Sequence, residues 1–408
     1  MTHRVQKNLY KLYVIKTAKW FSLIMPIIVL FFQDNGLSMS QIFWLKSVYS
    51  VGMLTMEIPS GYFGDVWGRK KTLIIGTLFT TAGFSLYSFS FGFWQFMLAE
   101  FILGIGQSFI SGSDSAMLYD TLKEENREHD YLKFEGRVTS IGNFSEAIAG
   151  ILGGLLATLS LRIPFICQAG VSALAIPAAF TLVEPAYSLS KRAAGWDDVK
   201  KVIRYTLHDH PNLRRFILFS SLAGTATLTY AWFVQPFLIE SKLPLAFFGL
   251  IWTLLNLTAG SFSMFAYRVE RKFSQNTVSG VLIFLIGVLF ILTGAFVSVW
   301  AIPLLFLFYG VRGIATPVFK DYIHIRISSE YRATVLSLRN MFIRILFAVL
   351  GPVLGWITDH YSLKTGLVSA GFFFMVLGFF LYYVTYSHRY NSSPSQARET
   401  PGGKRGET

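Results

Sequence analysis

Charged side chains inside long apolar runs are the residues of this 408-residue chain whose types and positions could do chemistry. Four are acidic, all in the first half of the chain, and six are basic: Glu57, Glu100, Asp114, Glu146, Lys16, Lys19, Lys46, Arg312, Arg339 and Arg344. A carboxyl group in an apolar cavity can take up and release a proton. The candidates for such a proton-coupling role are, in order, Glu146, Glu100, Asp114 and Glu57.

Depth within the apolar runs separates these residues into two groups. Glu146 and Arg312 lie near the middle of their runs, and Arg344 lies about ten residues into its own, or ~15 Å at the rise of an α-helix. A charge at that depth is costly and needs a partner or a function. The three lysines lie within about two helical turns of a run's end, so we predict that their long side chains reach the interface by snorkelling.

Helical spacing predicts which of these residues share a face. In the run around 95–118, one polar stripe would contain Glu100, Gln107, Ser111 and Asp114. Arg339 would point about 140° away from Arg344, so both cannot face one cavity, and we expect Arg344 to face the cavity or the contact between the two halves. Polar and aromatic side chains of this kind suit a cavity for an amphipathic organic solute, although the aromatic ones also suit packing at the lipid interface. The cavity candidates are Gln107, Asn143, Tyr230, Trp232, Tyr309, Arg312 and Arg344.

The composition indicates the elements that must position these residues. Hydrophobic residues make up 53% of the chain and charged residues only 14%, against about 25% charged in soluble domains. This excludes a soluble globular protein, a disordered chain and a collagen-like fibre, and continuous apolar runs argue against a transmembrane β-barrel. The single Cys167 has no partner for a disulfide. A polytopic helical membrane protein is predicted.

Twelve apolar runs are long enough to cross a bilayer as helices. They are 12–33, 41–63, 72–91, 95–118, 137–158, 164–183, 213–238, 244–266, 277–297, 299–319, 334–357 and 365–386. About 27 of the 36 Lys and Arg residues lie at the termini and the even-numbered connections, which predicts cytoplasmic termini. Because the positive charge is spread over many short loops, no nucleic-acid partner is expected.

The chain divides at one longer connection. We predict a six-helix half at 1–183, a cytoplasmic linker with an amphipathic surface helix at 184–212, a second six-helix half at 213–386, and a disordered tail at 387–408. Each half carries a pair of glycines four residues apart near the outer end of its fifth span, Gly150 with Gly154 and Gly351 with Gly355. Such pairs let helices approach closely.

The connection after the second span contains a specific motif, Gly61-Tyr-Phe-Gly-Asp65-Val-Trp-Gly68-Arg69-Lys-Lys. Its glycines permit a tight turn, and Asp65 can bind a helix end or Arg69. The motif resembles the signature of the major facilitator superfamily, G-x-x-x-D-[RK]-x-G-R-[RK]-[RK], with Val66 in place of the usual base. The resemblance implies a twelve-helix fold and a cytoplasmic latch between the two halves, formed here by Gly61, Asp65, Gly68 and Arg69.

Two motifs of proton-coupled exporters in that superfamily are present in part. The fourth span has Glu100 where the exporters commonly carry arginine, followed by Gly104 and Gly106, and the fifth span has Gly153-Gly154 without the usual proline. The resemblance therefore implies a secondary transporter working by alternating access, with proton-coupled efflux of a small amphipathic organic compound as the first choice. Proton-coupled uptake of a small metabolite is the alternative.

Other function classes lack their motifs in this sequence. It contains no phosphate-binding loop for ATP-driven transport, no metal-ligand spacing and no identifiable Ser/His/Asp set. We expect a protein that is not an enzyme and needs no cofactor or metal. Its expected partners are a small-molecule substrate, protons and the lipid bilayer. We expect a monomer in the plasma (inner) membrane, and the sequence leaves the substrate, the direction and the coupling ion open.

Overall fold

The computed structural model describes residues 2–185, 204–327 and 332–391, and every regular element among them is helical. The main helices are α1 (Thr2–Trp20), α2 (Ile28–Asp34), α3 (Met39–Val66), α4 (Arg69–Phe89), α5 (Phe93–Ile110), α6 (Ser113–Glu124), α7 (Tyr131–Leu159), α8 (Ile163–Ala173), α9 (Ala175–Thr181), α11 (Pro211–Glu240), α12 (Phe248–Ser263), α13 (Ala266–Lys272), α14 (Gln275–Ala295), α15 (Ile302–His324), α16 (Arg332–His360) and α17 (Leu363–Asn391). Short turns lie between them at η1 (Glu128–Asp130), η3 (Tyr205–Asp209), η4 (Leu245–Phe247) and η5 (Val299–Ala301).

Ten helical segments of the described chain are long and apolar enough to cross a membrane. They coincide with the third to twelfth predicted spans, with α5 and α6 together forming the fourth. The first two predicted spans correspond to the interrupted pair α1 and α2 and to α3, which carries Lys46 and Glu57 within its length. An all-helical membrane protein is therefore confirmed, and twelve spans agree with this arrangement.

The first predicted span is broken between α1 and α2. Free backbone groups at a break in hydrocarbon must find partners inside the protein. Two buried glutamines from other helices supply them. The Gln168 side-chain oxygen accepts from the Leu23 amide at 2.8 Å, while Gln235 accepts from the Val29 amide and donates to the Met25 carbonyl, both at 2.7 Å. The break is thus held from both halves of the molecule.

The fourth predicted span is also interrupted, at Ser111 and Gly112. Gly112 has φ +85°, a backbone conformation that glycine adopts without strain, and it separates α5 from α6. The predicted continuous polar stripe is therefore wrong, because the turn changes the direction of the side chains that follow it. Glu100 and Asp114 have entirely different partners.

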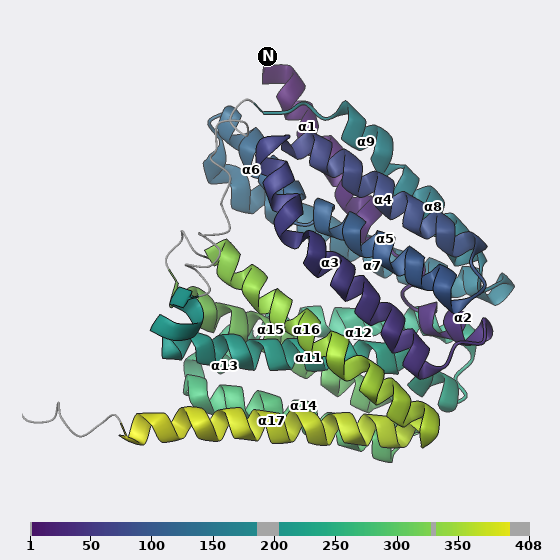
Figure 1. The fold of residues 1–408 in the computed structure, drawn as a ribbon, viewed down its shortest axis with the longest axis vertical. Coiled ribbons are helices and arrows are strands. Elements are labelled where there is room, and N and C mark those ends of the chain that lie inside the picture. The colour runs from purple at the N-terminus through teal and green to yellow at the C-terminus, as the bar shows by residue number, and fades with distance from the viewer. Residues whose placement is uncertain (1, 186–203, 328–331, 392–408) are drawn as a thin grey trace, which may run out of the picture.

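The two halves, α1–α9 and α11–α17, meet along α3 with α16 and α7 with α12. The predicted close approach at the paired glycines is confirmed at both contacts. An added Cβ on Gly154 would lie 2.8 Å from the backbone nitrogen of Gly249 in α12, and one on Gly355 would lie 2.7 Å from the Cα of Ser40 in α3. In Figure 1 the halves lie close together where α3 begins and α16 ends, and they diverge toward the opposite end.

A carboxylate links the halves at this closed end. The two oxygens of Asp359, near the end of α16, accept from the Met39 and Ser40 amides at the start of α3, each at 2.8 Å. These amides are among the unpaired donors of a helix N-terminus, which also favours negative charge. The Ser47 hydroxyl donates to the Ala348 carbonyl one step further along the same pair of helices, at 3.1 Å.

Asp359→Ala should shift the protein toward conformations that are open at this end. Loss of a helix cap costs about 1 kcal/mol, which corresponds to a roughly fivefold shift in population. Spin labels at Asp34→Cys and Tyr361→Cys, in a Cys167→Ser background, would report the separation of the halves. Glu240→Ala, an exposed acid at the end of α11, is the matched control, and an unchanged distance distribution in Asp359→Ala would contradict the clasp.

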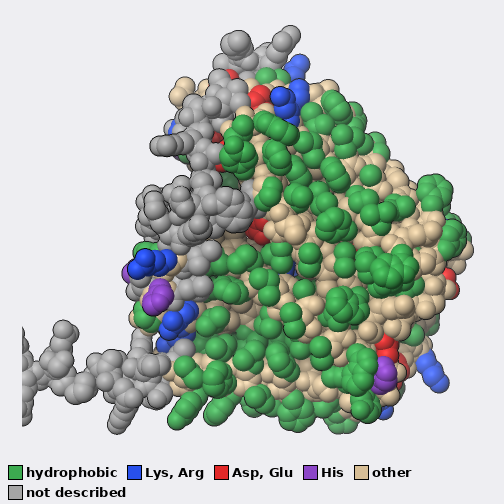
Figure 2. Space-filling view, viewed as in Figure 1, with side chains coloured by type: hydrophobic (Ala, Val, Ile, Leu, Met, Phe, Trp, Pro, Cys, Tyr) green, Lys and Arg blue, Asp and Glu red, His purple; other side chains and the backbone are tan. Residues whose placement is uncertain are grey.

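The outer surface is apolar over the spans. Figure 2 shows hydrophobic side chains over most of the visible face, with the visible Lys and Arg side chains mainly at its edges. Large exposed side chains such as Phe144, Val349 and Phe379, each at least 67% exposed, project from long apolar helices. A lipid environment explains their exposure, because contiguous apolar surface of this extent is rare on soluble proteins.

The predicted linker and tail are only partly described. The amphipathic helix falls mostly within 186–203, which lies outside the described residues, and α11 begins at Pro211. The predicted start of a disordered tail at 387 is too early, because α17 continues to Asn391. The described part of the chain ends there.

Candidate functional site

Three adjoining cavities lie between the two halves near the middle of the molecule. Their volumes are about 560, 210 and 280 Å³, and Glu146 of α7 lines all three. Arg312 of α15 lines the first two, whereas Trp232 of α11 and Met25 line the last two. The cavities therefore bring together residues that are far apart in the sequence, and they share one acid.

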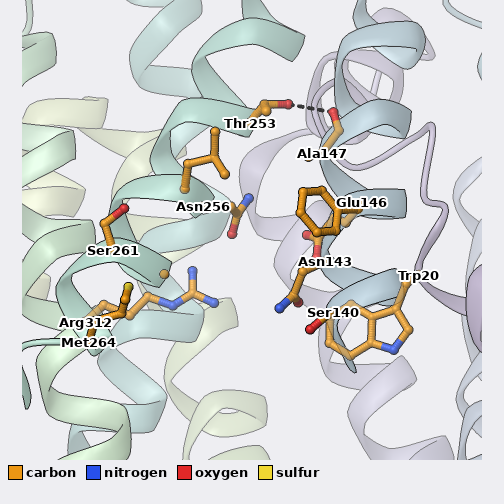
Figure 3. Close-up of a pocket in the computed structure, with 13 residues that line it drawn as sticks. Trp20, Ser140, Asn143, Glu146, Ala147, Thr253, Asn256, Ser261, Met264 and Arg312 are labelled. Atoms are coloured by element: carbon orange, nitrogen blue, oxygen red, sulfur yellow. Dashed lines mark hydrogen bonds between the residues drawn. The ribbon is translucent and has the colours of Figure 1, made fainter. Parts of the chain in front are cut away.

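The largest cavity lies between α7 and α12. Figure 3 shows Ser140, Asn143 and Glu146 on its α7 side and Asn256, Ser261 and Arg312 on the other, with Trp20 beside α7. The Thr253 hydroxyl donates to the Ala147 carbonyl at 3.0 Å and joins the two sides at one boundary. From this contact the cavity extends toward the end at which α7 begins and α12 ends.

Glu146 and Arg312 carry opposite charges on opposite halves. The Arg312 guanidinium points from α15 toward the α7 side of the cavity (Figure 3) and interacts electrostatically with Glu146. Within the described ranges, neither of them is part of a direct ion pair. The Trp252 indole lies near Glu146, and its nitrogen is buried with no hydrogen-bond partner among the described residues. The two charges thus face each other across space that a solute can enter.

Lys46 and Glu100 form a buried ion pair at the edge of the third cavity. The side chains are 6% and 2% exposed, and the Tyr87 hydroxyl donates to the same Glu100 oxygen at 2.5 Å. The Lys46 nitrogen also lies 4.6 Å from the centre of the Trp232 ring, a cation–π contact with the other half. The predicted snorkelling of Lys46 is wrong, because a buried acid holds its ammonium group inside the protein.

Asp114 is also paired with lysines. Its carboxylate lies 3.0 Å from the Lys16 nitrogen and 3.4 Å from that of Lys19, and Glu135 lies 3.9 Å from Lys16. Snorkelling is therefore wrong for these two lysines as well. The break at Gly112 turns Asp114 toward α1, which explains why it pairs there.

The remaining charged candidates lie on the contact between α3 and α16. Glu57 interacts with the Ser337 hydroxyl and with Arg344, so these two ionisable residues lie together but line none of the three cavities. Arg339 points elsewhere, as predicted, and donates to the Ser220 hydroxyl and, at 3.0 Å, to the Asn340 side chain. Arg344 lines none of the three cavities, so the structure does not support the prediction that it faces a cavity. Its interaction with Glu57 supports the alternative, a contact between the two halves.

The loop motif forms a polar cluster within the first half. Asp65 and Arg69 form an ion pair four residues apart, and Arg69 lies 4.0 Å from Asp120 of α6. Gly68 has φ +97° and begins α4, where the Glu184 carboxylate accepts from the Arg69 and Lys70 amides at 2.7 Å each. The motif therefore joins α3, α4, α6 and the segment that leads into the linker.

The profile of the Major Facilitator Superfamily matches residues 20–349 of the chain. The chain belongs to the major facilitator superfamily. An uncharacterized transporter of this superfamily from Bacillus subtilis, YxaM, is 23% identical over 86% of this chain and 89% of its own. Multidrug resistance protein 2 of the same organism is 26% identical over 42% of each chain. The crystal structure of the nucleoside transporter NupG has a TM-score of 0.77 at 16% identity, covering 94% of this chain and 98% of that one.

Membership confirms the predicted major facilitator fold and establishes a multi-pass membrane transporter. The loop after α3, whose sequence resembles the superfamily signature, carries a direct prediction. Asp65→Asn keeps the size of the side chain but removes the charge that binds Arg69. We expect strongly reduced transport with near-normal abundance in the membrane, measured as flux per amount of protein. Lys71→Gln, an exposed change in the same loop, should leave flux nearly intact, and wild-type flux in Asp65→Asn would contradict the prediction.

The structure sorts the predicted cavity residues of this superfamily member into two groups. Four of them line the cavities: Gln107, Asn143, Trp232 and Arg312. Tyr230 does not, because its ring stacks on Phe308 at 3.5 Å and its hydroxyl bonds Thr293 at 2.8 Å inside the second half. Tyr309 is 1% exposed, and its ring makes a cation–π contact with Arg312, whose guanidinium carbon lies 5.0 Å from the ring centre.

Several site residues were missed by sequence reasoning. Trp20 and Asn256 line the largest cavity, and Asp120 and Glu184 complete the cluster around Arg69. Trp20 directly follows Lys19 at the break of the first span, a place where a superfamily member can present side chains to a cavity. The position of Glu184 just after the sixth span gave no such signal, because its role depends on the fold bringing the end of that span next to the start of α4.

Proposed function

We propose that this transporter exports a small amphipathic organic solute in exchange for protons by alternating access. The observation that carries the proposal is the placement of Glu146 and Arg312, which come from different halves and face one cavity. A carboxyl group that two moving halves share can bind a proton in one conformation and release it in another. The partial likeness to a multidrug resistance protein supports export.

The conformation supports a rocking motion of the halves. The hydrogen bonds between the halves at Asp359, Ser47 and Thr253 lie toward the end where α3 begins and α16 ends, and the largest cavity extends away from them. The distribution of Lys and Arg supports a cytoplasmic location for the opposite end. We therefore propose an inward-facing state in the plasma (inner) membrane, with both termini cytoplasmic, acting as a monomer.

Flux into proteoliposomes with an imposed pH gradient tests the proposal. Exchange predicts that the solute accumulates in vesicles with an acidic lumen, because protons leave as the solute enters. Protein-free vesicles control for passive trapping of weak bases. Accumulation in vesicles with an alkaline lumen would instead support proton-coupled uptake. Arg312 favours this alternative, because it can bind an anionic solute when Glu146 is neutral. Flux of the same solute that ignores the pH gradient would refute proton coupling.

The proposed orientation has its own test. In a Cys167→Ser background, a cysteine at Ser160, exposed between α7 and α8, should react with an impermeant maleimide added to intact cells. A cysteine at Ser190, which lies outside the described residues, should react only after the cells are opened. The reverse pattern would overturn the assignment of the cytoplasmic side.

A further inference from the structure

The cation available to a ligand in the cavities is Arg312. The other cations that line them are already engaged, since Lys46 is paired with Glu100 and Lys19 with Asp114. The Arg312 guanidinium has no acid in direct contact across the described part of the chain, and it points into the cavity (Figure 3). A guanidinium presents paired donors that match the two oxygens of a carboxylate.

Two indole rings line the same space. Trp20 lines the first and third cavities and Trp232 the second and third, so their rings would contact a ligand held beside Arg312. The two indole nitrogens are buried and have no hydrogen-bond partner among the described residues. The rings therefore contribute apolar and aromatic surface to the cavities, and Arg312 contributes the charged donor.

The acid available to a ligand is Glu146. Glu100 already accepts from Lys46 and from Tyr87, and it is 2% exposed. Glu146 has no cation within ion-pair distance in the part of the chain that the structure describes, and it lines all three cavities. A ligand that offers an ammonium group beside its carboxylate would therefore meet Glu146 on one half and Arg312 on the other.

The rest of the smaller cavity between these charges is mainly apolar and aromatic, and its polar residues are Thr227, Gln235 and Asn256. Met25, Leu228, Trp232 and Trp252 line its walls, and its volume of about 210 Å³ limits the ligand to a small molecule. Indole rings also attract an ammonium group through their faces. The walls thus suit a hydrocarbon or aromatic side group attached to the charged centre.

We propose that the solute is a small zwitterion with an apolar or aromatic side group, whose carboxylate binds Arg312 and whose ammonium group binds Glu146. This inference rests on the proposed transport function and names its substrate class. It also gives the exchange a simple basis, because a proton and the ammonium group would compete for the same Glu146 carboxylate. Binding of the solute would then release the proton from Glu146, and binding of a proton would release the solute.

Binding to the purified full-length protein at one fixed pH tests the class, using two matched series of probes. The indole series is L-tryptophan, indole-3-propionate without the amine, and tryptamine without the carboxylate. The aliphatic series is L-leucine, 4-methylpentanoate and isoamylamine. In at least one series, we expect the zwitterion to bind at least tenfold more tightly than either partner, measured by calorimetry.

Two variants assign the two charges. Arg312→Gln should weaken the zwitterion at least tenfold and leave the amine unchanged, whereas Glu146→Gln should weaken the zwitterion and leave the acid unchanged. Arg268→Gln, an exposed arginine on α13, should change neither. Equal binding of the amine and the zwitterion, equal binding of the acid and the zwitterion, or no binding of any of the six probes would overturn the inference.

The binding readout is separate from proton coupling. Zwitterion binding with pH-independent flux would refute the proposed exchange and leave the substrate class standing. Proton-driven flux of a solute that lacks one of the two charges would do the opposite.

Discussion

Glu146→Gln is expected to abolish uphill, pH-driven transport while leaving downhill exchange of the solute partly intact. The amide keeps the size and most hydrogen bonds of the carboxyl group, but it cannot take up a proton. Glu146 lines every one of the three central cavities and forms no direct ion pair with the residues that the structure describes, so its protonation can follow the conformation and the occupancy of the site. Paired flux and counterflow assays in proteoliposomes measure the two activities separately.

Glu240→Gln is the matched control, since this acid is exposed at the end of α11, and it should behave as wild type. Glu100 is a weaker coupling candidate than its position in the sequence indicates, because its carboxylate is 2% exposed and already paired with Lys46. Full pH-driven transport in both Glu146→Gln and Glu100→Gln would show that neither is the coupling site. Asp114 and Glu57 would then be the acids to test.

Lys46→Met is expected to destabilise the folded protein by about 3–5 kcal/mol, the usual cost of removing one partner of a buried ion pair. Glu100 is 2% exposed, so the variant leaves a buried carboxylate that keeps its hydrogen bond from the Tyr87 hydroxyl but loses its paired cation. Loss of the cation–π contact with Trp232 adds to the effect. Thermal unfolding of the purified protein in one detergent would measure the difference as a lower midpoint.

The double variant Lys46→Met with Glu100→Gln should recover most of that loss, because no uncompensated charge remains. Lys364→Met, which removes an exposed lysine near the start of α17, serves as the control and should have little effect. Equal destabilisation of the single and double variants would mean that packing around Lys46, and not the ion pair, accounts for the loss.

Local features of the sequence were sufficient for the architecture. Helix length and apolar composition predict spans because a bilayer demands about 20 apolar residues in a row. Pairs such as Gly150 with Gly154 predict close helix contacts, because glycine has no side chain and lets the backbone of whichever helix packs against it approach closely. The motif from Gly61 to Lys71 identified the superfamily for the same reason, since its turn and its Asp65–Arg69 pair are built from neighbours.

The partners of buried charges were decided by the tertiary structure. Lys46 and Glu100 are 54 positions apart, and Asp114 is 98 positions from Lys16, so no local pattern links them. The position of each lysine near the end of a span made snorkelling reasonable. An acid on a neighbouring helix is a better partner than the interface, because it satisfies the charge without stretching the side chain.

The sequence by itself determined that this protein is a helical membrane transporter with acids in one half and arginines in the other. Only the tertiary structure decided that Glu146 and Arg312 face one cavity and that the first span breaks above it. The apolar segment 21–27 contains Pro26, and its free backbone groups are satisfied by Gln168, 145 positions from Leu23, and by Gln235, 210 positions from Met25. Such a break is stable only where a distant side chain replaces the lost hydrogen bonds, and that depends on how the two halves come together.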